Sequence, residues 1–91
     1  MPQITVPIPS GLEPFVQKAS LDLAQRLAID IDEIEVVEVT PKTWPDTSLG
    51  CPEPGMMYAQ MLQDGLLIKL KANGQLYDYH SGGTRDPFLC E

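Results

Sequence analysis

The sequence predicts an α+β domain in which one N-terminal amphipathic helix packs on an antiparallel sheet of about four strands. Three observations predict it. Apolar residues recur at helical spacing between residues 12 and 27, a β-branched run occupies residues 34–40, and two Asx-Gly pairs interrupt alternating runs between residues 57 and 80. A helix followed by consecutive strands is typical of α+β domains.

The chain is short and acidic. Its 91 residues, 43% of them hydrophobic, suit a single domain with an extended arm (1–9), a folded core (10–80) and a C-terminal tail (81–91). Six Lys and Arg against thirteen Asp and Glu give a net charge of −7, so we expect repulsion from nucleic acid and from anionic membranes. Because the N-terminus has no basic segment followed by a long apolar one, we expect a cytoplasmic protein.

The arm and the helix come first. Three prolines within residues 2–9 favour extended backbone. Ser10 and Glu13 then form the S-x-x-E pattern of a capping box, and Pro14 lies in the first turn, where its missing N–H costs nothing. We therefore expect a helix from Ser10 to about Ile29, with Asp22 and Arg26 as an i,i+4 ion pair on its polar face.

The next element is a strand at residues 34–40, preceded by an acidic turn. Pro41 is expected to end it. Acidic residues between positions 30 and 38 form the most acidic window of the chain, which is typical of a solvated turn and a charge-protected edge strand. The window lacks the D-x-D-x-D-G spacing of an EF-hand calcium loop.

A three-stranded meander is expected at residues 57–62, 66–72 and 75–80. Asp64-Gly65 and Asn73-Gly74 are both pairs that favour two-residue type I′ turns. Counting outward from these turns sets the register, in which the following residues face one another: Met61 and Ile68, Ala59 and Leu70, Leu70 and Tyr77, Ile68 and Tyr79, and Lys69 and Asp78.

The second face of this sheet is too apolar to be fully solvated. It carries Leu62, Leu67 and Leu76 beside His80, so some other segment must cover part of it. The apolar material left is Trp44, Leu49, the arm and Phe88-Leu89. We therefore expect the 44–58 loop to fold back over the sheet and Phe88-Leu89 to dock on the domain, rather than to serve as a peptide for a partner.

That loop is the most constrained segment of the chain. Residues 44–58 contain three prolines, two glycines, a tryptophan and a cysteine, and alternating proline with glycine favours one backbone path. Asp46 is expected to form an Asx turn with the residues after it, and Trp44 to be a core or lid aromatic. The candidate interaction residues are Trp44, Asp46, Cys51, Glu53, Met56, Tyr58, His80 and Phe88.

The chain resembles a small bacterial family of cyanobacterial type. The residues that carry the resemblance are the run Leu21–Leu27, the segment Asp32–Val37, the block W-P-D-x-S-L-G-C-P-x-P-G that begins at Trp44, and Tyr77-Asp78-Tyr79-His80. The resemblance covers about residues 19–80. It implies a shared fold and a cyanobacterial-type source, and it transfers no catalytic residue and no ligand. Asp30 departs from the family, in which a helix-ending glycine is expected.

Cys51, Cys90 and His80 are the only residues that suggest reactive chemistry. Cys51 and His80 could serve as nucleophile and base, but Cys51 lies between Gly50 and Pro52 instead of at a helix N-terminus, so we expect no catalytic residue. A metal site would need Cys51, His80 and Cys90 completed by Asp46 or Glu91, without the C-x-x-C spacing of tetrahedral sites. The two cysteines are expected to remain thiols in a reducing cytosol, with a disulfide between them as the alternative.

The sequence thus favours a non-enzymatic, acidic protein-interaction or regulatory module that uses the rigid loop 44–56. It is expected to need no cofactor, to bind an unknown protein partner, and to be a monomer or a weak homodimer. Two alternatives stay open: a thiol-dependent or metal-dependent site at Cys51, His80 and Cys90, and a loop presented as protease inhibitors present theirs. An equal alternative is that the prolines and glycines of the loop only turn a tight corner.

Overall fold

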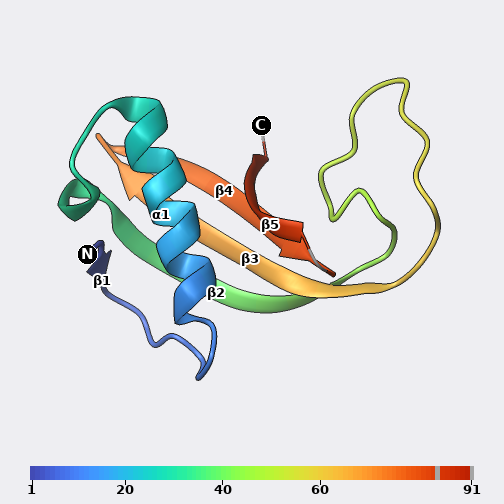
Figure 1. The fold of residues 1–91 in the computed structure, drawn as a ribbon, viewed down its shortest axis with the longest axis horizontal. Helices are drawn as coiled ribbons and strands as arrows, with labels where there is room; N and C mark the ends of the chain where they lie inside the picture. Colours follow the sequence, from blue (N-terminus) through green and yellow to red (C-terminus); the bar gives the residue numbers. More distant parts are fainter. Residues whose placement is uncertain (84, 91) are drawn as a thin grey trace.

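The protein folds as one helix packed on an open, mostly antiparallel sheet, which confirms the predicted α+β class. The computed structural model describes residues 1–83 and 85–90. Among these residues the sheet has five strands in the order β1-β2-β3-β4-β5, and helix α1 (Glu13–Leu27) crosses one face of it (Figure 1). No helix in the described part of the chain is long and apolar enough to cross a membrane.

Helix α1 buries one stripe of small and branched side chains against the sheet. Pro14 lies in its first turn as expected, but the Ser10–Glu13 capping box is wrong: the N-cap is Leu12, and no side chain caps the helix there. Glu13 instead accepts a hydrogen bond from the Gly11 amide at 3.1 Å. The helix ends at Leu27 because Ala28 adopts a left-handed conformation, two residues before the expected end. The capping box of the chain lies at the short 3₁₀ helix η1 (Ile31–Glu33).

Strand β2 (Glu35–Trp44) is longer than predicted. Pro41 does not end it, and the strand continues to Trp44. The two-residue strand β1 (Gln3–Ile4) pairs in parallel with Glu35 and Val36 alone, so the described partners leave Pro41 on an open edge, where its missing N–H removes no ladder bond. A bulge at Val37 shifts the register between Val36 and Glu38.

Strands β3 (Gln63–Ala72) and β4 (Gln75–Gly82) confirm the second half of the predicted meander. They meet at Asn73-Gly74, both residues with positive φ, and Ile68 faces Tyr79, Lys69 faces Asp78 and Leu70 faces Tyr77.

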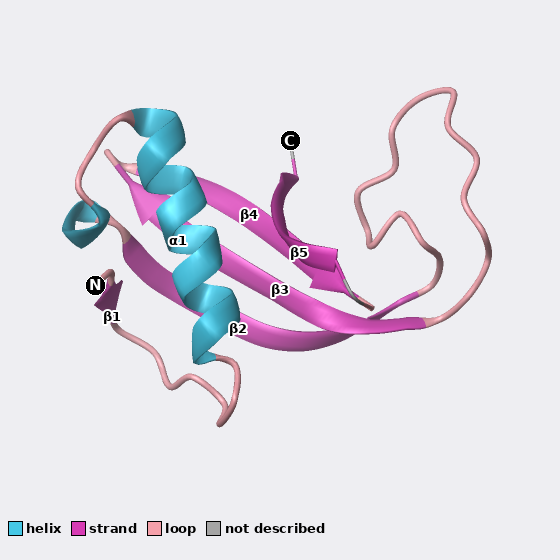
Figure 2. Ribbon diagram, in the orientation of Figure 1, coloured by secondary structure: helices cyan, strands magenta, loops and turns pink. Residues whose placement is uncertain are grey.

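The first half of that meander is wrong. Residues 57–62 form no strand, so Met61 does not face Ile68 and Ala59 does not face Leu70. Asp64-Gly65 lies inside β3, opposite Lys42 and Thr43 of β2, and neither residue has positive φ. The β2–β3 hairpin is therefore closed by the long loop 45–62 (Figure 2) and not by a two-residue turn.

Strand β5 (Arg85–Cys90) confirms that Phe88-Leu89 docks on the domain. It pairs antiparallel with β4, with Phe88 opposite His80 and Leu89 opposite Tyr79. The ladder then passes to Gly82 and Arg85, so Ser81 alone lies opposite two residues of β5. This bulge alters the direction of the backbone where the two strands separate.

A polar contact ties the helix to the middle of the sheet. The fully buried Tyr79 hydroxyl donates to Asp22 Oδ2 at 2.6 Å, and Arg26 Nε donates to the same oxygen at 2.6 Å. The second contact confirms the predicted i,i+4 pair. Apart from the buried Ser20 of α1, the rest of the helix–sheet interface is apolar and is built mainly from Val16, Ala19, Leu23, Ile34, Val36, Leu66, Ile68 and Leu70.

Candidate functional site

Trp44 holds the start of the 45–62 loop against the face of the sheet that the helix does not cover. Its side chain is buried, its ring stacks on His80 with centroids 4.7 Å apart and planes 12° from parallel, and its Nε1 donates to the Ser81 carbonyl at 2.8 Å. The lid role expected for Trp44 is confirmed. The loop therefore folds back over the sheet from its first residue.

Three glycines make room for this indole. A Cβ atom on Gly50 would lie 2.4 Å from Trp44, and one on Gly82 would lie 2.7 Å from Leu49. A Cβ atom on Gly65 would lie 1.9 Å from the Ser81 carbonyl oxygen and 2.7 Å from Trp44 Nε1. Gly65 is thus required for close approach, which explains why the Asp64-Gly65 pair is not a turn.

Hydrogen bonds within the loop fix its course. Asp46 forms the predicted Asx turn: its carboxylate accepts from the Ser48 amide at 2.9 Å and from the Ser48 hydroxyl. These two bonds, the hydroxyl one foremost, lower the pKa of Asp46. Further along, Thr47 and Ala59 exchange two bonds of 3.0 Å, from the Thr47 amide to the Ala59 carbonyl and from the Ala59 amide to Thr47 Oγ1.

A disulfide joins the loop to the last strand. Cys51 of the loop is bonded to Cys90 of β5, with Cα atoms 5.8 Å apart. The expectation of two free thiols is therefore wrong for this structure, because β5 brings Cys90 onto the face over which the loop folds. The predicted strand boundaries could not show this, since they left residues 81–91 as a tail.

A groove of about 460 Å³ lies between the loop and β5. It is lined by five of the candidate residues, Cys51, Glu53, Met56, Tyr58 and Phe88, together with Ser48, Pro52, Pro54, Arg85 and Leu89. The Arg85 guanidinium lies 3.9 Å above the Phe88 ring, and the Tyr58 hydroxyl accepts from the Glu53 amide at 3.0 Å. The groove thus combines aromatic rings and prolines with one cation and one carboxylate.

The other three candidates do not line this groove. Trp44 and His80 are buried, and Asp46 turns the backbone. His80 Nδ1 lies 2.7 Å from the Leu49 carbonyl, and the His80 ring lies at a 60° tilt to Phe88 with centroids 6.3 Å apart. These residues therefore hold the loop in place behind the groove.

Of the most exposed part of the loop, the sequence indicated only Met56 and Tyr58 as candidates. Residues 56–62, called here the methionine limb, carry Met56, Met57, Met61 and Leu62 with 58%, 95%, 59% and 76% of their surface exposed. The sequence predicted a strand at residues 57–62 from the alternating run before Asp64-Gly65, and this strand placed every second side chain on the covered face of the sheet. Arg85 was also missed, because its role depends on the pairing of β5.

In the disulfide form neither sulfur is available as a nucleophile or as a metal ligand. The described residues contain no group of three or more His, Cys, Asp or Glu side chains that could hold a metal ion. Glu91, named as a fourth ligand, lies outside the described residues.

Comparison with known proteins gives one family. The model of the domain of unknown function DUF8738 matches residues 16–90, which covers the helix from Val16 onward, β2 to β5, the anchored loop and both cysteines. No curated protein and no solved structure matches the chain. With most of its length matched, including the groove and the disulfide that bounds it, this chain belongs to the DUF8738 family.

Proposed function

We propose that the chain is a small acidic, non-enzymatic interaction module that binds a protein partner with the 45–62 loop and the groove beside it. One observation carries the proposal. The loop is anchored by a disulfide and a buried tryptophan, and it presents the methionine limb to solvent. Exposed apolar side chains gathered on one segment are typical of protein-binding surfaces, and methionine adapts to varied partners.

The anchoring favours binding because little entropy is lost. A loop already fixed by Cys51, Trp44 and the Thr47–Ala59 bonds needs little further ordering when a partner docks. The loop projects past the ends of the strands, so a partner could reach its outer limb without contacting the helix (Figure 1). Glu53 and Arg85 would then fix orientation at the rim of the groove.

Photo-crosslinking from single positions tests this proposal. A photoreactive residue at Met57 should capture a discrete protein partner from extracts of the source organism, and changing Met56 to Ser should weaken that capture. Leu76, with 63% of its surface exposed on β4, provides the matched control position. Equal capture of the same proteins from positions 57 and 76 would show that the limb has no special affinity.

Trp44 is not suitable for this experiment. Its side chain is buried, so a change there would loosen the loop as well as any contact with a partner.

A second candidate function is inhibition of a protease by presentation of the segment 52–55. It is favoured by the exposure of these residues directly beside the disulfide, where a segment is held ready for a cleft. Titration against representative serine and cysteine proteases tests it, since an inhibitor would reduce activity stoichiometrically. Intact activity, or cleavage of the loop at normal rates, would rule it out.

We propose further that the chain acts as a monomer or weak homodimer in the cytoplasm of a cyanobacterial-type bacterium. In a reducing cytosol the pair would stay as thiols, and Trp44 and the Thr47–Ala59 bonds would then hold the loop without the disulfide. Rapid alkylation of thiols in intact cells, followed by mass spectrometry, shows whether Cys51 and Cys90 are reduced or disulfide-bonded there. Complete oxidation of Cys51 and Cys90 in cells would make the cytoplasmic assignment wrong.

A further inference from the structure

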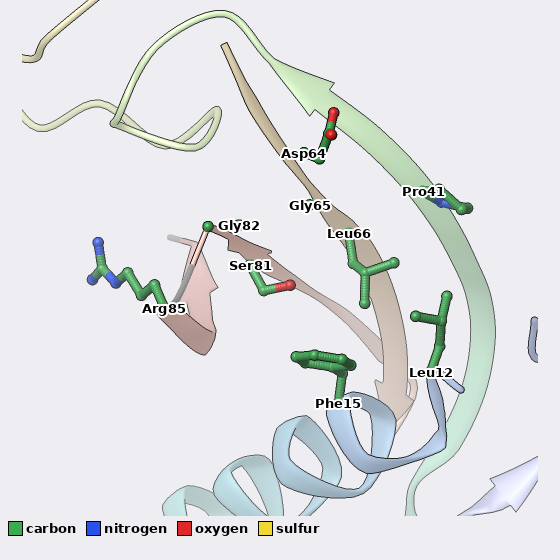
Figure 3. Close-up of a pocket in the computed structure, with 10 residues that line it drawn as sticks. Leu12, Phe15, Pro41, Asp64, Gly65, Leu66, Ser81, Gly82 and Arg85 are labelled. Atoms are coloured by element: carbon green, nitrogen blue, oxygen red, sulfur yellow. The ribbon is translucent and has the colours of Figure 1, made fainter. Parts of the chain in front are cut away.

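A second pocket lies on the opposite side of the sheet from the groove, and no role has been given to it above. Its volume is about 260 Å³, and Leu12 and Phe15 of the helix face Leu66 and Ser81 of the sheet across it (Figure 3). The rest of the lining is formed by Pro41, Asp64, Gly65, Gly82, Gly83 and Arg85. The pocket arises because α1 begins at Glu13, while β2, β3 and β4 continue beyond that end of the helix (Figure 1).

The pocket has one polar group directed into it. Ser81 is only 3% exposed, and in Figure 3 its hydroxyl points toward Phe15 and Leu66. Its carbonyl accepts from the Trp44 indole N–H at 2.8 Å on the other face, so the carbonyl and the hydroxyl of Ser81 serve opposite faces of the sheet. The bulge in β5 lies opposite Ser81, at the point where the ladder opens. Bulges often orient a side chain toward a functional site.

Both charged residues of the rim are engaged elsewhere. Asp64 accepts a hydrogen bond from the Thr43 hydroxyl at 3.2 Å, and the Arg85 guanidinium lies over Phe88. Figure 3 shows the Arg85 side chain directed away from the pocket. The interior therefore offers apolar surface and a hydroxyl but no charge.

We propose that this pocket binds a small neutral molecule made of a single apolar ring with one hydroxyl group. The ring would pack between Phe15 and Leu66, and its hydroxyl would hydrogen-bond to Ser81 Oγ. The size suits a single ring: an apolar cavity of about 150 Å³ already accepts benzene, while the pocket, at about 260 Å³, stays below the roughly 300 Å³ at which sites for drug-sized ligands begin. A charged ligand is disfavoured because desolvating it would bring no compensating partner.

Titration of the protein with benzyl alcohol, followed by amide NMR, tests the proposal, with toluene as the matched probe that lacks the hydroxyl. We expect benzyl alcohol to shift the amides of Phe15, Leu66 and Gly83. In Ser81→Ala the affinity for benzyl alcohol should fall about fivefold, the value of one net hydrogen bond, while the affinity for toluene stays the same. Benzoate should bind more weakly than benzyl alcohol.

Two further variants locate the site. Leu12→Trp, which fills the pocket from its rim, should abolish both shifts, and Leu76→Ala on the opposite face should leave them intact. Unchanged β3–β4 amide signals would show that each variant is folded, and Phe15→Trp replaces Leu12→Trp if the latter is not. Absence of shifts in the unsubstituted protein, or equal affinity of Ser81→Ala for benzyl alcohol, would overturn the proposal. The groove proposal is unaffected by either result, because Arg85 is the only described residue that lines both cavities and none of the variants changes it.

Discussion

Trp44 shows how a single side chain can organise a loop of 18 residues when the backbone positions around it are glycines. Its ring has His80 on one face and Gly50 at its edge, and its N–H reaches the Ser81 carbonyl past Gly65. A methyl group added at Gly50 or Gly65 would overlap the indole. The position of the groove therefore depends on residues that do not line it.

Replacement of Gly65 tests this dependence. Gly65→Ala should lower the free energy of unfolding by about 3 kcal/mol, at the upper end of the range for overpacked sites, because the new Cβ would overlap the fixed backbone oxygen of Ser81. Gly82→Ala is the matched control. Its Cβ would meet the movable tip of Leu49, so a loss of about 1 kcal/mol is expected. Urea unfolding measures both, and equal losses would contradict the argument.

At the scale of elements, the helix is fastened to the sheet by the contact between Asp22 and Tyr79. Burial, and then the hydrogen bond to the Asp22 carboxylate, raise the pKa of Tyr79 well above its ordinary value. Burial alone would raise the pKa of Asp22, but hydrogen bonds from Tyr79 and Arg26 outweigh it and lower that pKa. The two shifts act on stability at opposite ends of the pH scale.

We expect the unsubstituted protein to lose stability above about pH 10, the ordinary tyrosine pKa. There the unfolded chain releases the Tyr79 proton while the folded chain still keeps it. Tyr79→Phe should show a flatter alkaline limb, because the phenol that ionises on unfolding has been removed. Thermal unfolding between pH 8 and pH 11 measures this, and identical slopes for the two proteins would contradict it.

The acid limb has the opposite sign. The lowered pKa of Asp22 gives stability that is present above about pH 4, the ordinary aspartate pKa, and is lost as the pH falls through the folded value. Asp22→Asn should remove this contribution, so its stability should vary less between pH 5 and pH 2 than that of the unsubstituted protein. If the stability of Asp22→Asn fell more steeply at acid pH than that of the unsubstituted protein, the folded-state pKa of Asp22 would be raised and not lowered.

At the scale of the whole molecule, the disulfide links the loop to the last strand across 39 residues of sequence. In the chain-entropy model a closure of that length stabilises the fold by roughly 4 kcal/mol. Reduction, or the Cys51→Ser substitution, should lower the free energy of unfolding by about that amount. Urea unfolding with and without reductant measures it. Cys51→Ser should no longer respond to reductant, and a reductant effect that persists in this variant would assign the loss to another cause.

The sequence could predict those parts of the molecule that local signals specify. Asn73-Gly74 has positive φ in both residues and sets the β3–β4 register, and Asp46 turns its own backbone. Asp64-Gly65 carried the same signal and was misread, because only the contact with Ser81 reveals why a glycine is needed there. The pairing of β5 and the Cys51–Cys90 bond depend on long-range contacts, which no turn signal encodes.

The same limit applied to the site. Five of the candidate residues do line one groove. They could be predicted because the prolines and glycines of the loop indicate a fixed backbone path. Met57, Met61, Leu62 and Arg85 were not predicted as site residues, since their exposure and position follow from which strands pair.

The chain contains one tryptophan, and it lies beneath the segment that the disulfide secures. Its intrinsic emission is therefore a spectroscopic reporter that needs no label. Reduction of the disulfide, or any other event that loosens this segment, would admit water to the indole and move the emission to longer wavelength. Stopped-flow fluorescence of the unlabelled, unsubstituted protein could therefore measure the rate at which this loop opens.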